Sequence, residues 1–187
     1  MKKPRVLSVV GWLLMAAVIA FFLFRYIDAQ NYEDWLEAQA VAVVEQVQAI
    51  PAEELEYVAR YAPWQLPSQA IVTPGWKEKL GDQEYIIQMS DEQLDVAVRK
   101  LVDTMTLSSV ESRETPPDSG EALLNITFFD GQDGGITFYL RSNIRLEYRV
   151  EMEDGNLLYA QYAVDRDALL TLWDALGVPR KIATSIE

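Results

Sequence analysis

Apolar and polar residues change their spacing along the chain, and each spacing predicts a different kind of element. Residues 6–24 form an unbroken apolar run, and residues 28–50 carry apolar side chains every three or four positions, as a helix does. From residue 84 onward, alternating strand patterns are interrupted by two helical stretches. The pattern predicts an α+β protein: a transmembrane helix continuing into a helical stalk, then a small antiparallel meander of four or five strands packed with helices.

The first run predicts a membrane anchor. Residues 6–24 are 19 residues without a charged side chain, and a helix of that length spans roughly 28 Å, close to the hydrocarbon thickness of a bilayer. Lys2, Lys3 and Arg5 precede the run and only Arg25 follows it closely. The positive-inside bias therefore predicts a cytoplasmic N-terminus and a body outside the cytoplasm.

A cleaved signal peptide is the alternative to an anchor. Ile27 and Ala29 would permit cleavage after Ala29, and the protein would then be secreted. The apolar run is longer than the roughly 7 to 15 residues of a typical signal peptide. Arg25 and Tyr26 also interrupt the approach to the cleavage site. Both observations favour the anchor, and both interpretations place the bulk of the chain outside the cytoplasm.

Residues 28–50 contain neither Gly nor Pro and predict a stalk helix that ends before Pro51. One side of this helix carries an apolar stripe made of Tyr32, Leu36, Ala40, Val43, Val47 and Ile50. The stripe has two uses that the sequence leaves open. It packs on the body of its own chain, or it pairs with a second helix in a short coiled coil.

Residues 51–83 are expected to connect the stalk to the body. Their first part, 52–62, predicts a short helix, and the rest is rich in Pro and Gly and predicts irregular structure. Trp64 and Trp76 lie in this connector. Each is a candidate interaction residue, with burial in the loop's own packing as the competing interpretation.

The body begins at residue 84 with a predicted strand over 84–89 and a helix after it. Ser90 and Gln93 have the spacing of a capping box, in which Ser90 is the predicted N-cap of the helix. The buried stripe of this helix is predicted to be Leu94, Ala97, Val98, Leu101 and Met105. A weak strand is expected over 106–113.

Asp130 and Asp133, among glycines, raise the question of a calcium loop. If Phe128 pairs with Ile136, then Ile126 faces Phe138 and Leu124 faces Leu140, so one register aligns three apolar pairs. The loop lacks the oxygen ligands that a calcium loop needs at its fifth and twelfth positions. The sequence therefore predicts a hairpin turn without a metal.

Residues 144–164 predict a second hairpin with a two-residue turn at Asp154 and Gly155. That register places Met152 opposite Leu157, and it leaves Leu158 and Tyr162 on an outer face that is half polar and half apolar. Leu158 and Tyr162 are therefore candidate interaction residues as well. A final helix is predicted from the cap Asp165 to Gly177, with a buried stripe made of Leu169, Leu172, Trp173 and Leu176.

Composition excludes several kinds of chemistry. The chain has no Cys and no His, which removes disulfides, thiolate metal sites, histidine bases and Ser-His-Asp hydrolysis. No cofactor, metal site or catalytic residue is predicted. Four of the 16 basic residues lie within the first 27, so 12 basic and 29 acidic residues remain beyond them, a balance of −17. A body this acidic disfavours nucleic-acid binding.

The expected organisation is a cytoplasmic tip and anchor (1–27), a stalk (28–50), a connector (51–83) and an α+β extracytoplasmic domain (84–187). The function expected is a non-catalytic protein-interaction or scaffolding role in the cell envelope. Its partners would be the bilayer through residues 6–24 and another envelope protein, or a second copy through the stalk. The alternative is a small-ligand sensor or a carboxylate-based hydrolase, for which Glu147 and Glu151 share one strand face.

Overall fold

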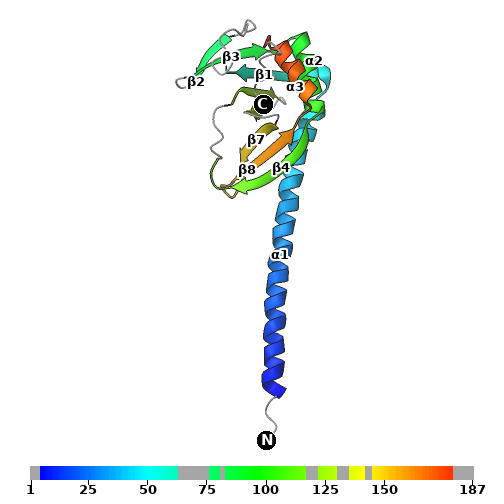
Figure 1. Cartoon of the computed structure of the whole chain (residues 1–187), viewed down its shortest axis with the longest axis vertical. Coiled ribbons are helices and arrows are strands. Elements are labelled where there is room, and N and C mark those ends of the chain that lie inside the picture. Colours follow the sequence, from blue (N-terminus) through cyan, green and yellow to red (C-terminus); the bar gives the residue numbers. More distant parts are fainter. Residues whose placement is uncertain are drawn as a thin grey trace. The chain divides into compact units, whose positions relative to one another are not determined.

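A computed structural model of the whole chain describes residues 5–62, 76–80, 83–116, 122–129, 135–141 and 145–178 (Figure 1). The chain divides into two compact units, Met1–Ala38 and Gln39–Glu187. Each unit is described by itself below.

The first unit consists of most of helix α1, which runs over Arg5–Gln48. Among the described side chains from Trp12 to Ile27, the large apolar ones are exposed. By length and composition this helix is apolar enough to cross a membrane. The N-terminal apolar helix predicted from the sequence is therefore present, and burial of its side chains in a bilayer would remove the large exposed apolar surface.

The second unit is built on one antiparallel sheet of eight strands in the order β2-β3-β1-β5-β6-β7-β8-β4. The strands are β1 (Glu56–Tyr61), β2 (Trp76–Leu80), β3 (Gln83–Met89), β4 (Thr106–Arg113), β5 (Leu124–Phe129), β6 (Ile136–Leu140), β7 (Arg145–Glu151) and β8 (Leu157–Ala163). The expected four or five strands were too few. Strands β1 and β2 form from the predicted connector, residues 51–83.

The short helix predicted over 52–62 is wrong. The chain there forms one 3-10 turn, η1 (Ala52–Glu54), and then β1, which lies between β3 and β5 inside the sheet. Tyr57, Ala59 and Tyr61 alternate along β1 and are 3%, 0% and 0% exposed. Because this alternation buries a whole strand face, tertiary packing prevails over the helical preference of the Ala and Glu residues.

The register predicted for the β5–β6 hairpin is confirmed. Leu124 pairs with Leu140, Ile126 with Phe138 and Phe128 with Ile136. The rings of Phe128 and Phe138 meet edge to face, with their centroids 6.0 Å apart. Asp130 and Asp133, on which the calcium question rests, lie outside the described residues.

The register predicted for the β7–β8 hairpin is wrong by one residue. Met152 accepts a hydrogen bond from the Gly155 amide at 3.0 Å and its own amide donates to Asn156 at 2.8 Å, so the loop has three residues. Only Gly155 takes a positive φ, at 81°, whereas the expected two-residue turn needs two such residues. The shift pairs Leu146 with Tyr162 and Val150 with Leu158.

The described part of the second unit also contains two helices. Helix α2 (Glu92–Asp103) follows β3, and helix α3 (Arg166–Ala175) follows β8. The apolar stripes predicted for both are buried. The cap of α3 is Asp165, as expected, but α2 is capped by Asp91 rather than Ser90, since the Asp91 carboxylate accepts from the Leu94 amide at 2.9 Å. Gly177, with φ 75°, ends the last helix as predicted.

The C-terminal end of α1, which belongs to the second unit, packs on the body. Ala40, Val44 and Val47 are at most 6% exposed, and the Tyr162 hydroxyl donates to the Ala40 carbonyl at 2.8 Å. Arg99 of α2 donates to the carbonyls of Gln48 and Ile50. Over this stretch the helix therefore uses its apolar side for its own chain, with Val44 buried in place of the predicted Val43.

Two glycines give a test of the hairpin geometry. A Cβ on Gly135 would meet the Phe128 carbonyl oxygen and lie 2.7 Å from Cγ2 of Thr127, whereas a Cβ on Gly155 would meet nothing within 4 Å. We expect Gly135→Ala to lower the free energy of unfolding by about 2 kcal/mol through steric overlap. Gly155→Ala should lower it by about 1 kcal/mol through its positive φ alone.

Thermal or urea unfolding of the full chain in detergent, followed by circular dichroism, measures both variants. The critical result is that Gly135→Ala lowers the free energy of unfolding more than Gly155→Ala does. If Gly135→Ala is neutral, the close approach of β5 and β6 at this point is wrong.

Candidate functional site

The sheet has two faces of opposite character. One face, which includes Tyr57, Phe138 and Tyr162, is buried and bonds to the helices, as the hydrogen bonds from Tyr57 to Asp95 and from Tyr162 to Ala40 show. The other face of strands β4 and β6–β8 carries polar side chains, because side chains alternate along each strand. We call it the arginine–tyrosine face, made of Ser109, Glu111, Arg113, Tyr139, Arg141, Arg145, Glu147, Arg149, Glu151, Tyr159 and Gln161.

A buried ion pair lies within this face. The Arg141 Nε donates to Oε2 of Glu147 at 2.7 Å, and the two side chains are only 9% and 11% exposed. Tyr139 stands directly opposite Glu147 on the neighbouring strand. Two charges removed from water in this way are expensive unless they stay together, so the pair fixes where Arg141 lies on the face.

Arginines stack on both tyrosines of the face. The guanidinium carbon of Arg149 lies 4.8 Å from the ring centroid of Tyr139, and that of Arg113 lies 5.0 Å from the centroid of Tyr159. A guanidinium over an aromatic face gains cation–π attraction and loses rotamer freedom. The face therefore holds its arginines in defined positions.

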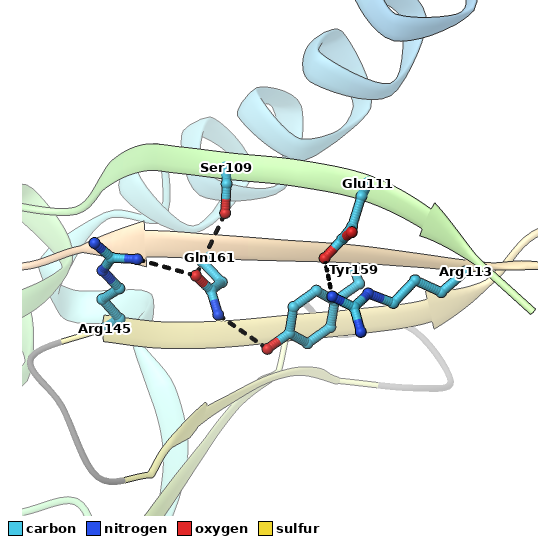
Figure 2. Close-up of polar contacts among 6 residues, drawn as sticks. All are labelled: Ser109, Glu111, Arg113, Arg145, Tyr159 and Gln161. Atoms are coloured by element: carbon cyan, nitrogen blue, oxygen red, sulfur yellow. Dashed lines mark hydrogen bonds and ion pairs between the residues drawn. The ribbon is translucent and has the colours of Figure 1, made fainter. Parts of the chain in front are cut away.

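Gln161 connects three strands at the centre of the polar cluster shown in Figure 2. Its amide nitrogen donates to the Tyr159 hydroxyl at 3.1 Å, while its amide oxygen accepts from Arg145 at 3.3 Å and from the Ser109 hydroxyl at 3.4 Å. Glu111 forms an ion pair with Arg113 beside this network (Figure 2). The network ties β4 and β7 to β8 through side chains as well as backbone.

The same surroundings change the acidity of Tyr159. Burial raises the pKa of its phenol above the ordinary value, and the nearby Glu147 carboxylate raises it further. The Gln161 hydrogen bond and Arg113 act in the opposite direction. Tyr159 is therefore neutral at physiological pH and acts as a hydrogen-bonding group rather than a base.

Two polar atoms on this side of the sheet are buried without a hydrogen-bond partner among the described residues. They are the Nε of Arg113 and Oδ1 of Asn125, one a donor and the other an acceptor. Asn125 is opposite Tyr139 in the β5–β6 register. Unsatisfied buried groups cost free energy, and a ligand or partner with matching polar groups would remove that cost.

The four residues singled out from the sequence fall elsewhere. Trp64 lies outside the described residues, and Trp76 begins β2, its side chain also outside them. Tyr162 and Leu158 are 0% and 2% exposed on the buried face. Their placement on an outer face followed from the wrong β7–β8 register, and the corrected register moves both into the core.

The two carboxylates considered for hydrolysis, Glu147 and Glu151, lie in different surroundings. Glu147 is held by Arg141, while Glu151 is exposed at the end of β7. Within the described part of the chain, no three acidic side chains are grouped so that they could hold a metal ion. Two surface hollows, of about 510 and 610 Å³, flank the exposed Val96 on α2 and lie away from the arginine–tyrosine face.

Part of this face was visible in the sequence. The alternation of Arg145, Glu147, Arg149 and Glu151 defined the polar side of β7, and the β5–β6 register already turned Tyr139 away from the core. The contribution of β4 was hidden, because β4 pairs with β8, which is not its neighbour in the chain.

Comparison with known proteins gives no relative: the chain matches no protein-family model, no curated protein and no solved structure.

The buried ion pair predicts a strongly asymmetric mutational response. Arg141→Met should lower the free energy of unfolding by about 3 kcal/mol, because it leaves the Glu147 carboxylate buried without its positively charged partner. Arg141→Met combined with Glu147→Leu should recover most of that loss. Thermal unfolding of the full chain in detergent measures both.

Arg60 and Glu78, 3.2 Å apart with side chains 33% and 40% exposed, provide the matched control. Arg60→Met should cost at most about 1 kcal/mol, since water screens an exposed pair. Equal losses for Arg141→Met and Arg60→Met would contradict the assignment of a buried pair.

Proposed function

We propose that this protein is a single-pass membrane-anchored protein whose folded part lies outside the cytoplasm and binds another protein through the arginine–tyrosine face. In this role it acts as an interaction or scaffolding module of the cell envelope and performs no catalysis. The apolar helix α1 supports membrane attachment, and the side chains on β4 and β6–β8 support the interaction.

The arrangement of arginines and tyrosines is the observation that carries the proposal. Beyond residue 27 the chain has 12 basic and 29 acidic residues, yet this face gathers Arg113, Arg141, Arg145 and Arg149 around two tyrosines. Arg and Tyr are enriched where proteins bind one another, because they combine contact area with hydrogen bonding. Stacking and ion pairing hold three of these arginines before any partner arrives, which lowers the entropy lost on binding.

The partner expected is a protein segment that carries carboxylates and hydrogen-bonding groups. Carboxylates complement arginine in a bidentate geometry, and Arg145 is exposed to receive one. The buried Nε of Arg113 would gain an acceptor from the same kind of segment. A hydrolytic role has less support, because the Glu147 carboxylate is already held by Arg141.

A photo-crosslinking amino acid at position 145 tests the binding face in intact membranes. We expect an adduct with a second, different polypeptide, and we expect Arg149→Glu to reduce its yield about tenfold by reversing a charge on the face. The matched control places the crosslinker at Val96 on α2, 66% exposed and away from the face. No adduct from position 145, or equal adducts from positions 145 and 96, would exclude this face as the binding site.

The anchored topology is tested separately. The bias of Lys2, Lys3 and Arg5 should keep the N-terminus in the cytoplasm, so protease added to intact cells should degrade residues 28–187 and leave an N-terminal membrane fragment. Ala16→Arg should impair insertion, since a charge at the helix centre costs roughly 3 kcal/mol. A mature protein beginning at Gln30 would show cleavage instead of anchoring, and a body protected until lysis would reverse the orientation.

A further inference from the structure

The sheet is open and has two edge strands, β2 and β4. Strand β4 pairs with β8 on one side, and among the described residues no backbone hydrogen bond reaches its other side. In an antiparallel ladder, alternate residues of an edge strand direct their N–H and C=O groups away from the sheet. Thr106, Ser108, Ser109 and Glu111 are exposed along this edge, so the groups are accessible.

The two edges differ in how they are protected. Strand β2 carries Lys77 and Lys79, both exposed, and edge lysines prevent the addition of another strand. Strand β4 has neither Lys nor Pro over residues 106–113. Its register irregularity lies between Leu107 and Ser109, which leaves 109–113 as a regular stretch. The β4 edge is therefore the one open to strand addition.

The charges on β4 indicate which kind of strand would pair with its open edge. Glu111 and Arg113 lie two residues apart on the same side of the strand, with side chains 48% and 38% exposed. If a second copy of β4 pairs antiparallel with Ser112 opposite Ser112, Glu111 comes opposite the second copy's Arg113, and Arg113 opposite the second copy's Glu111. A purely acidic strand would be repelled by Glu111 and a purely basic strand by Arg113, whereas a second copy complements both.

We propose that two copies of this chain associate through their β4 edges, joining their sheets into one continuous antiparallel sheet around a two-fold axis at Ser112. The interface is isologous, with backbone hydrogen bonds between the two edge strands and two reciprocal Glu111–Arg113 ion pairs. In the single chain, Arg113 lies over the ring of Tyr159, 5.0 Å from its centroid, and pairs with Glu111 of its own chain, so the proposed interface exchanges this internal ion pair for two between the copies. This association goes beyond the proposed function, which concerns a different polypeptide.

The absence of cysteine from the chain makes a disulfide test direct. Ser112→Cys in the full chain, in detergent micelles or native membranes, should give a covalent dimer on mild oxidation, because directly opposed residues lie about 4.5 to 5.5 Å apart. The matched control, Lys77→Cys, places an exposed thiol on the other edge of the sheet. Dimers from both variants or from neither would overturn the β4 interface.

Charge reversal tests the register and separates contacts between copies from the ion pair within one chain. Either Glu111→Arg or Arg113→Glu alone places like charges opposite each other in a homodimer, and we expect dimerisation to weaken about tenfold. Mixing the two variants should restore dimers made of one copy of each, because every opposed pair is then of opposite charge. Within each chain the Glu111–Arg113 pair remains broken, so repair inside one chain cannot produce that result.

Tagging each variant differently and measuring co-purification and mass by light scattering gives the readout. Selective pairing of the two variants supports the interface and shows that both remain folded. Equal self-association of each variant, or no restoration on mixing, would overturn it. Crosslinking from position 145 to a different polypeptide is an independent measurement, so failure of the dimer and failure of the proposed function can be told apart.

Discussion

The three-residue loop at Gly155 sets the relation between β7 and β8, and much of the second unit depends on it. A shift of one residue in a hairpin exchanges the faces that opposed side chains share. With the loop closed by the hydrogen bonds of Met152 to Gly155 and Asn156, Leu146 and Tyr162 meet on the core side. The four charged residues of β7 then share the other side with Tyr159 and Gln161.

The side-chain contacts on both faces of the sheet follow from this pairing. On the core side, Tyr162 reaches the Ala40 carbonyl and connects β8 to the end of α1. Burial raises the pKa of this phenol, so it remains a donor over the physiological range. On the other side, Gln161 reaches Arg145 and Ser109, and this is possible because the register brings these side chains to one level of the sheet.

Local patterns in the sequence were sufficient where the contact partners are close in the chain. The β5–β6 register followed from three apolar pairs, and the stripes of α2 and α3 followed from helical spacing. Strand β1 could not be predicted in this way, because its helix-favouring residues become a strand only between β3 and β5, which lie far along the chain. The position of β4 beside β8 is another long-range pairing with no local signal.

For the same reason, only part of the candidate site could be predicted from the sequence. Alternation identifies the outward side of β7, but the loop at Asp154 and Gly155 admits two lengths with similar sequence preferences, and Asp-Gly favours the shorter one. The shorter loop predicts that Tyr162 and Leu158 are surface residues. The distinction depends on whether one or two loop residues take a positive φ, which the sequence Asp-Gly does not determine.

Several groups of the arginine–tyrosine face add little to the free energy of unfolding or lower it. An ion pair as buried as that of Arg141 and Glu147 adds little net stability compared with apolar residues of the same size, because desolvation offsets the attraction. Arg113 Nε and Asn125 Oδ1 add a cost, since both are buried without a partner among the described residues. A sheet face that served only packing would be more stable without these groups. Their presence is understandable if the cost is recovered on binding, when a partner supplies the missing donor and acceptor and the arginines are already in place.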